Sequence, residues 1–211
     1  MQPDIIFAIL ILIVSVILHE VAHGYMANYL GDPTARLAGR LTLNPISHID
    51  PVGSILLPVL LIVTNSPFLI GWAKPVPYNP YNLRGYWGEA LVAGAGPAVN
   101  IALALFFALI IRFFAADMSE AFLSALATIV LINMLLALFN LLPIPPLDGS
   151  KVLSAILPGP LGRGYEALRA QFEQAGMFVG LILILILFYF FGPLFFSALR
   201  ALFYLLTGIA F

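Results

Sequence analysis

The chain has 211 residues, of which 62% are hydrophobic and 9% are charged. Soluble domains average roughly 45–50% apolar and about 25% charged residues, and a soluble fold cannot bury so large an excess of apolar surface. Nine Lys and Arg against ten Asp and Glu provide no cationic surface for nucleic acid, and the absence of cysteine excludes disulfides, iron–sulfur clusters and thiol nucleophiles. The composition predicts an integral membrane protein in which any metal must be held by His, Asp or Glu.

Hydropathy predicts a single membrane domain, residues 1–211, with several apolar segments. The first is Ile5–Tyr29, and Asp4 stands where a signal peptide would carry basic residues. Residues 52–64 are too few for a span of about 20 residues and contain Pro58, which favours a re-entrant segment. The later predicted segments are spans at 89–114, 120–142 and 176–191, a possible further span at 193–211 after a break at Gly192-Pro193, and a surface helix at 164–174.

The distribution of basic residues orients these segments. If 52–64 is re-entrant, seven basic residues fall on one side of the membrane and Arg112 falls on the other; the seven are Arg36, Arg40, Lys74, Arg84, Lys151, Arg163 and Arg169. The positive-inside rule makes the side with seven cytoplasmic and places the N-terminus outside. Residues 35–44, on the cytoplasmic side, have a weak two-residue alternation that predicts a short strand or hairpin.

The first span contains a His-Glu-x-x-His motif, His19-Glu20-Val21-Ala22-His23. Residues four apart lie on one face of a helix, so both imidazoles can reach one ion, and Glu20 can take a proton from a water activated by that ion. Zinc suits these ligands, and a catalytic zinc keeps three protein ligands and one open position. His19 lies roughly 21 Å along the helix from Ile5, which places the predicted site nearer the cytoplasmic face.

Asp148 is the best candidate for the third ligand; His48 and other carboxylates at this depth are the alternatives. It follows the predicted span 120–142, which runs from outside to cytoplasm and ends on the side of the two histidines. Prolines in 143–146 break the helix there, and irregular backbone at membrane depth is tolerated only where it lines a cavity within protein. Capping of a helix near Lys151 is the alternative role for Asp148.

These motifs resemble the site-2 proteases, a family of intramembrane zinc metalloproteases. The resemblance is carried by three motifs, which are His19-Glu20-x-x-His23, Gly96-Pro97-x-x-Asn100 and Asn140-x-x-Pro143-x-Pro145-x-x-Asp148-Gly149. Residues 44–57 and 71–77 are similar to the compact bacterial and archaeal branch. The resemblance covers about residues 5–157, the expected catalytic core, whereas the C-terminal spans in 176–211 match only in being hydrophobic. No PDZ or CBS domain is visible.

The resemblance implies that His19, His23 and Asp148 hold one zinc ion per chain and that Glu20 is the general base. It implies substrates that are transmembrane segments, often of anti-sigma factors, signal-peptide remnants or membrane-tethered regulators, cleaved by a multi-pass protein of the inner cell membrane. It also implies a membrane-entering β-hairpin at 35–44, whose exposed edge would bind unwound substrate by strand addition. The expected fold is an all-α polytopic helical bundle with this hairpin and a re-entrant segment.

Three further residues have open roles. Asn140 is a candidate for binding a substrate backbone or an oxyanion, with helix packing as the alternative. Asn100 is a second candidate, although its place beside Gly94 and Gly96 is more typical of a residue that lets helices approach closely. His48, in a loop, is typical of a surface or capping residue, with a metal or substrate contact as the minority interpretation.

Two other function classes compete with proteolysis. A catalytically silent homologue, acting as a membrane scaffold or regulator, would be favoured by a missing glutamate or ligand, and none is missing. A transporter or channel would use the His/Glu cluster as an ion path, but transporters usually have repeated halves, and no repeat is found. We therefore expect hydrolysis of peptide bonds within or near transmembrane segments. The sequence indicates neither a particular substrate nor an oligomeric state.

Overall fold

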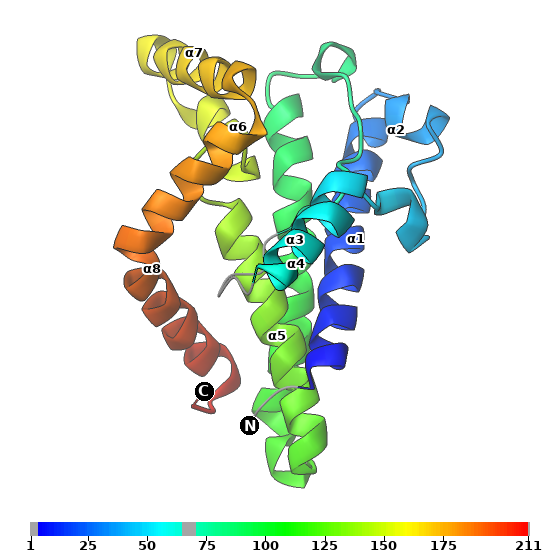
Figure 1. The fold of residues 1–211 in the computed structure, drawn as a ribbon, viewed down its shortest axis with the longest axis vertical. Helices are drawn as coiled ribbons and strands as arrows, with labels where there is room; N and C mark the ends of the chain where they lie inside the picture. Colours follow the sequence, from blue (N-terminus) through cyan, green and yellow to red (C-terminus); the bar gives the residue numbers. More distant parts are fainter. Residues whose placement is uncertain (1–3, 65–70, 211) are drawn as a thin grey trace.

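The computed structural model describes residues 4–64 and 71–210, and within these ranges the secondary structure is helical throughout, with no strand (Figure 1). The α-helices of these ranges are α1 Ile5–Tyr29, α2 Thr34–Leu37, α3 Leu57–Val63, α4 Gly88–Phe114, α5 Glu120–Asn140, α6 Asp148–Ile156, α7 Gly159–Ala175 and α8 Met177–Thr207. Short 3₁₀ segments lie at Pro45–His48, Pro80–Asn82 and Ala115–Asp117, and a π-helical turn lies at Pro51–Leu56.

Four of the described helices are long and apolar enough to cross a membrane, and they are Ile5–Tyr29, Gly88–Asp117, Glu120–Asn140 and Ile182–Thr207. Large apolar side chains on these helices point outward: Ile6 is 77% exposed, Phe113 73% and Phe190 69%. Such surfaces are stable in lipid and not in water. The prediction of an all-α, multi-pass membrane protein is confirmed.

Helix α4 lies at the centre of the bundle and packs against α1, α5, α6 and α8 (Figure 1). Its buried alanines Ala104 and Ala108, one turn apart, join Val130 of α5 and Phe203 of α8 in the main apolar cluster. Small side chains on the central helix let the neighbouring helices approach closely. The candidate site lies between α4 and α1.

The predicted break at Gly192-Pro193 is wrong, because both residues lie inside one helix, α8, which runs from Met177 to Thr207. A proline removes one backbone donor and disturbs the carbonyl four residues earlier, and transmembrane helices absorb this by bending. Figure 1 shows α8 changing direction about midway along its length. In the sequence Pro193 stands near the middle of this helix. The second half of α8 therefore completes a span that begins at Ile182; Phe211, the end of the predicted segment, lies outside the described residues.

The predicted strand or hairpin at 35–44 is also wrong. This stretch contains the end of α2, followed by a turn and loop with no strand. Asp32 accepts hydrogen bonds from the backbone N–H and hydroxyl of Thr34, at 3.3 and 2.6 Å, which favour a helical turn at this point. An isolated two-stranded hairpin without a further strand is marginal.

Residues 52–64 belong to a stretch of chain that is flanked by hydrogen-bonded backbone. The segment begins in the π-helical turn, continues as α3 and is followed by 65–70, outside the described residues. The N–H of Trp72 then donates to the Gly53 carbonyl at 3.2 Å, and the N–H of Lys74 donates to the His48 carbonyl at 2.9 Å. The backbone on the two sides of this stretch is therefore hydrogen-bonded together.

Candidate active site

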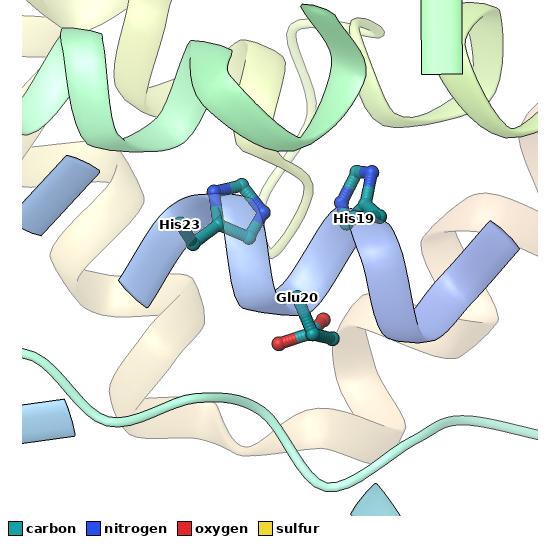
Figure 2. Close-up of side chains that lie close together, drawn as sticks. All are labelled: His19, Glu20 and His23. Atoms are coloured by element: carbon teal, nitrogen blue, oxygen red, sulfur yellow. The ribbon is translucent and has the colours of Figure 1, made fainter. Parts of the chain in front are cut away.

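The two motif histidines lie on one buried face of α1, turned toward α4 (Figure 2). His19 is 6% exposed and His23 9%. Their rings meet edge to face, with centroids 4.7 Å apart. The four-residue spacing therefore places both imidazoles side by side, as the sequence predicts.

The Nδ1 atom of each ring is held by an oxygen of α4. His19 Nδ1 lies 2.6 Å from the side-chain oxygen of Asn100, and His23 Nδ1 lies 2.7 Å from the Val92 carbonyl. These oxygens only accept hydrogen bonds, so both Nδ1 atoms donate. In a neutral imidazole the other nitrogen, Nε2, then carries a free lone pair.

Asp148 completes this group from a segment 129 residues away in the chain. It is the first residue of α6, and its Oδ2 atom lies 3.1 Å from His19 Nε2 and 3.3 Å from His23 Nε2. Gly149 makes this placement possible, because a Cβ there would collide with the Leu141 carbonyl. The loop at 141–147 thus folds back tightly after α5 and presents Asp148 to α1.

The donor set fits a divalent metal such as zinc. Two imidazole nitrogens and one carboxylate oxygen converge here. When both rings are neutral and protonated on Nδ1, each of these three atoms offers a lone pair that a cation would satisfy. The wall behind them is Gly96 of α4, where a Cβ would stand 2.5 and 2.6 Å from the two Nε2 atoms. Only glycine leaves room for this pair of rings and their ligand.

Glu20 lies at the edge of this group. One potential ligand atom from each of His19, Glu20 and His23 lies within 4.8 Å of the other two. Figure 2 shows the carboxylate on the side of α1 opposite the imidazoles, toward an extended piece of backbone. There its Oε2 atom accepts a hydrogen bond of 2.9 Å from the N–H of Val76.

The backbone that contacts Glu20 belongs to residues 71–79, which we term the strap. Beyond Glu20, the strap is attached to the rest of the protein by hydrogen bonds involving Gly53, Ser54, His48, Arg40 and Asp32. At its far end the N–H of Asn79 donates to Asp32 Oδ2 at 2.7 Å. The strap is therefore held on both sides of its contact with Glu20.

Asp32, just after α1, is the anchor of the strap. Burial disfavours its charge, but the hydrogen bonds donated by Thr34, Asn82 and Asn79 outweigh burial and hold the pKa of Asp32 below its ordinary value. The side chain of Asn82 contributes one of them, at 2.9 Å. An ionised Asp32 thus ties the end of α1 to the strap and to the 3₁₀ turn that follows it.

A lysine of α6 also contacts the strap. Lys151 lies one turn after Asp148, with its ammonium 5.1 Å from the centre of the Tyr78 ring. Burial lowers the pKa of Lys151, but Tyr78 and the carboxylates of Asp148 and Glu89 raise it by more, so that it lies above its ordinary value. The strap and α6 are thus joined beside the candidate site.

The three residues with open roles, Asn100, Asn140 and His48, lie outside the group of candidate metal ligands. Asn100 is fully buried behind His19, which favours an orienting role over contact with a substrate. Asn140, at the end of α5, donates to the Leu136 carbonyl one turn earlier, at 2.9 Å. His48 is buried, not on the surface, and its Nε2 lies 2.8 Å from the Thr42 carbonyl.

Sequence reasoning missed three residues that touch the candidate site or its neighbours. Val76 contacts Glu20, and Asn133 and Ser15 extend the hydrogen bonds from Asn100. Two signals were present: Ser15 precedes His19 by four residues, on the same helix face, and Asn133 is a polar residue inside an apolar span. Val76 had no such signal, because its backbone makes the contact.

Comparison with known proteins gives a consistent assignment. The sequence model of Peptidase family M50 matches residues 114–187. A Bacillus subtilis protein named "Putative zinc metalloprotease YwhC" is 39% identical over 84% of this chain and 79% of its own length. Rip2 of Mycolicibacterium smegmatis, which carries the same description, is 35% identical over 65% of this chain and 52% of its own length. Zinc metalloprotease MJ0392 of Methanocaldococcus jannaschii is 28% identical over 89% of this chain and 44% of its own length.

No solved structure matches the chain at a significant level. The sequence relatives and the four apolar helices nevertheless agree with the chemistry of the site. This chain belongs to peptidase family M50, the site-2 proteases, which are multi-pass membrane zinc metalloproteases.

Proposed function

We propose that this protein hydrolyses peptide bonds within or near transmembrane segments of membrane-protein substrates, with one zinc ion per chain held by His19, His23 and Asp148. The observation that carries the proposal is the approach of Asp148 Oδ2 to both imidazole Nε2 atoms, at 3.1 and 3.3 Å, on the buried face of an apolar helix. A water-using site inside a span suits substrates that lie in the membrane as well.

In this proposal Glu20 is the general base and acid. Zinc, when bound, supplies Lewis-acid chemistry that activates water and polarises the scissile carbonyl. Glu20 takes a proton from the attacking water and delivers it to the leaving amine, since its carboxylate lies at the edge of the ligand group. The Val76 N–H holds that carboxylate in place.

Asn140 has the proposed role of binding the substrate backbone or the developing oxyanion. It ends α5, immediately before the loop that carries Asp148. Its side-chain amide donates to the Leu136 carbonyl at 2.9 Å, which orients the group, and the second N–H of the amide is a donor that a substrate oxygen can accept from. Donors placed where charge develops are worth several kcal/mol in such reactions, typically about 3.

The proposed topology places the protein in the cell (inner) membrane with the N-terminus outside and the site nearer the cytoplasmic face. The backbone bonds that join Gly53 to Trp72 and His48 to Lys74 support a re-entrant course for 52–64. Seven of the nine basic residues then fall on the cytoplasmic side, which the positive-inside rule favours.

We also propose a single membrane domain for residues 1–211. All of the proposed catalytic residues lie in a core of about 5–157. The C-terminal span in α8 supports that core by packing against α4 and α5.

A cleavage assay with a panel of tagged single-span proteins tests this function. Their transmembrane segments carry central Gly or Pro residues, which ease the unwinding that backbone attack requires. The purified protein and each panel member are reconstituted together into liposomes, and products are mapped by mass spectrometry. Cleavage inside a transmembrane segment, lost in Glu20→Gln with zinc retained, is expected.

Zinc content separates the proposed enzyme from a silent scaffold. About one zinc per chain is expected in the wild type and in Asp117→Ala, an exposed aspartate at the other end of the bundle, with much less in Asp148→Ala. Equal zinc in all three would remove Asp148 as a ligand. A folded wild type that binds no zinc would contradict the proposal and favour the scaffold.

A further inference from the structure

A chain of buried polar side chains runs from His19 into the interior between α1, α4 and α5. Its members are Asn100, Asn133 and Ser15, which are 0%, 1% and 3% exposed. Asn100 donates from Nδ2 to Asn133 Oδ1 at 2.9 Å, and Asn133 donates from Nδ2 to Ser15 Oγ at 3.0 Å. Three buried polar residues in apolar helices are costly unless each makes its hydrogen bonds.

The side-chain amide of Asn133, which is farthest from His19 along these hydrogen bonds, can face only one way. The amide nitrogen of Asn133 also lies 2.9 Å from the Ile129 carbonyl, one turn earlier in α5. A carbonyl oxygen can only accept, so the NH₂ group of Asn133 must face it. Its side-chain oxygen is then turned toward Asn100.

The orientation of the Asn133 amide in turn sets the orientation of the Asn100 amide, which contacts the candidate site. The oxygen of Asn133 requires a donor, so the NH₂ group of Asn100 faces Asn133, and the oxygen of Asn100 faces His19 Nδ1. An oxygen at 2.6 Å requires a proton on Nδ1, which leaves Nε2 of the neutral ring free to bind a cation. The Ile129 carbonyl of α5 thus sets the orientation of Asn100 through Asn133, and a longer bond of 3.4 Å from Nδ2 of Asn100 to the Ser15 carbonyl of α1 acts in the same sense. Together they determine which nitrogen of His19 is protonated.

We propose that Asn133 is a positioning residue that sets the tautomer and orientation of His19 for metal binding. The proposal rests on the zinc site of the proposed function. Hydrogen bonding between helices alone would leave the direction of the amides open, whereas here every donor and acceptor from Ile129 to His19 points the same way. Partners of this kind behind a metal-ligating histidine typically contribute 10–100-fold to metal affinity.

Four variants test the proposed role. Asn133→Leu and Asn133→Ala remove the nearer acceptor for Asn100 and leave only the 3.4 Å bond to the Ser15 carbonyl, so that the amide can turn and offer its NH₂ group to His19. Asn133→Asp is the conservative variant, because a protonated carboxyl keeps an acceptor for Asn100 and a donor for Ile129. Ser15→Ala is the matched control: Asn133 loses the Ser15 partner but keeps the Ile129 carbonyl that orients it.

Two measurements are made on detergent-purified protein. Zinc affinity is measured by competition with a chelator, and ¹⁵N-histidine NMR of the metal-free protein at pH 8 reports which ring nitrogen carries the proton. The chain has only three histidines, so each can be assigned by substitution. We expect roughly 10–100-fold weaker zinc binding in the Leu and Ala variants, with protonation moving to Nε2 of His19. A smaller loss is expected for Asp, and Ser15→Ala should stay within about threefold of wild type.

Wild-type affinity and an unchanged Nδ1–H signal in both Asn133→Leu and Asn133→Ala would overturn the proposal. Two non-polar variants of different size are used in case one of them fails to fold. A loss of zinc affinity in Ser15→Ala as large as that in Asn133→Leu would also contradict the proposal. A wild-type protein that binds no zinc would contradict the proposed function instead, since the NMR comparison tests the Asn133 role in the metal-free protein.

Discussion

The backbone N–H of Val76 donates a hydrogen bond of 2.9 Å to Oε2 of Glu20, the glutamate between the two motif histidines. Val76 stands between Pro75 and Pro77, which have no N–H, so it supplies the only backbone donor of this three-residue stretch. The residue before a proline also favours extended backbone. The Pro-Val-Pro sequence thus presents a single donor, on a pre-extended strap, to Glu20.

Replacing Val76 with proline removes this donor. We expect Val76→Pro to lower kcat for peptide hydrolysis by roughly 10-fold or more, because a hydrogen bond to a charged group contributes about 1.5–3 kcal/mol. Zinc content should not change. Val76→Ala keeps the N–H and loses only the side chain that packs near Gly24, so it is the matched control. Equal kcat in the two variants would contradict a role for the N–H.

Adding a methyl group at Gly96 should disrupt the candidate metal site. A Cβ at this position would lie 2.5 and 2.6 Å from Nε2 of His23 and His19, so Gly96→Ala must displace one or both rings. Gly94→Ala, two residues earlier in α4, meets nothing within 4 Å and serves as the control. We expect at least roughly 10-fold weaker zinc binding in Gly96→Ala alone, measured by chelator competition. Equal zinc affinity in Gly96→Ala and Gly94→Ala would contradict the close packing of Gly96 against the two rings.

The anchor at Asp32 should make the stability of the fold depend on pH. Its pKa is lower in the folded protein than in the unfolded chain, so its ionisation stabilises the fold above the ordinary aspartate pKa of about 4. This contribution is lost as the pH falls through the lower folded-state pKa. Asp32→Asn should therefore lower Tm at pH 7 by roughly 5 °C and flatten the decline of Tm in acid.

The measurement for Asp32 is thermal unfolding in detergent between pH 3 and 7, followed by tryptophan fluorescence, since Trp72 lies in the strap. Asp117→Asn removes an exposed aspartate and should leave Tm unchanged at every pH. If Asp32→Asn keeps the wild-type decline in acid, Asp32 does not contribute this pH dependence.

The proposed re-entrant course of 52–64 predicts which side of the membrane the strap faces. The chain has no cysteine, so Lys74→Cys and Asp117→Cys each introduce a single thiol at an exposed position. In sealed, oriented vesicles, a membrane-impermeant maleimide should label Cys at 74 from the cytoplasmic side and Cys at 117 from the opposite side. Labelling of both from the same side would mean that 52–64 crosses the membrane.

The sequence by itself determined those features that depend on local spacing and hydropathy. Four apolar helices follow from runs of apolar residues, and the shared face of His19 and His23 follows from a four-residue spacing within one helix. Two local predictions of secondary structure were wrong. Pro193 does not end its helix, because a membrane helix can bend around a proline, and 35–44 forms no hairpin, because no further strand supports one.

The tertiary structure decided the atomic contacts between distant segments. The approach of Asp148 to the histidines, predicted from topology and resemblance, depends on how α4, α5 and α6 pack, and so do the partners of Asn100 and Val76. A hydrogen bond needs its two atoms within a few tenths of an ångström of an ideal separation. Apolar periodicity specifies which face of a helix is buried but not how far one helix slides or turns against another, and that freedom exceeds the tolerance of a hydrogen bond.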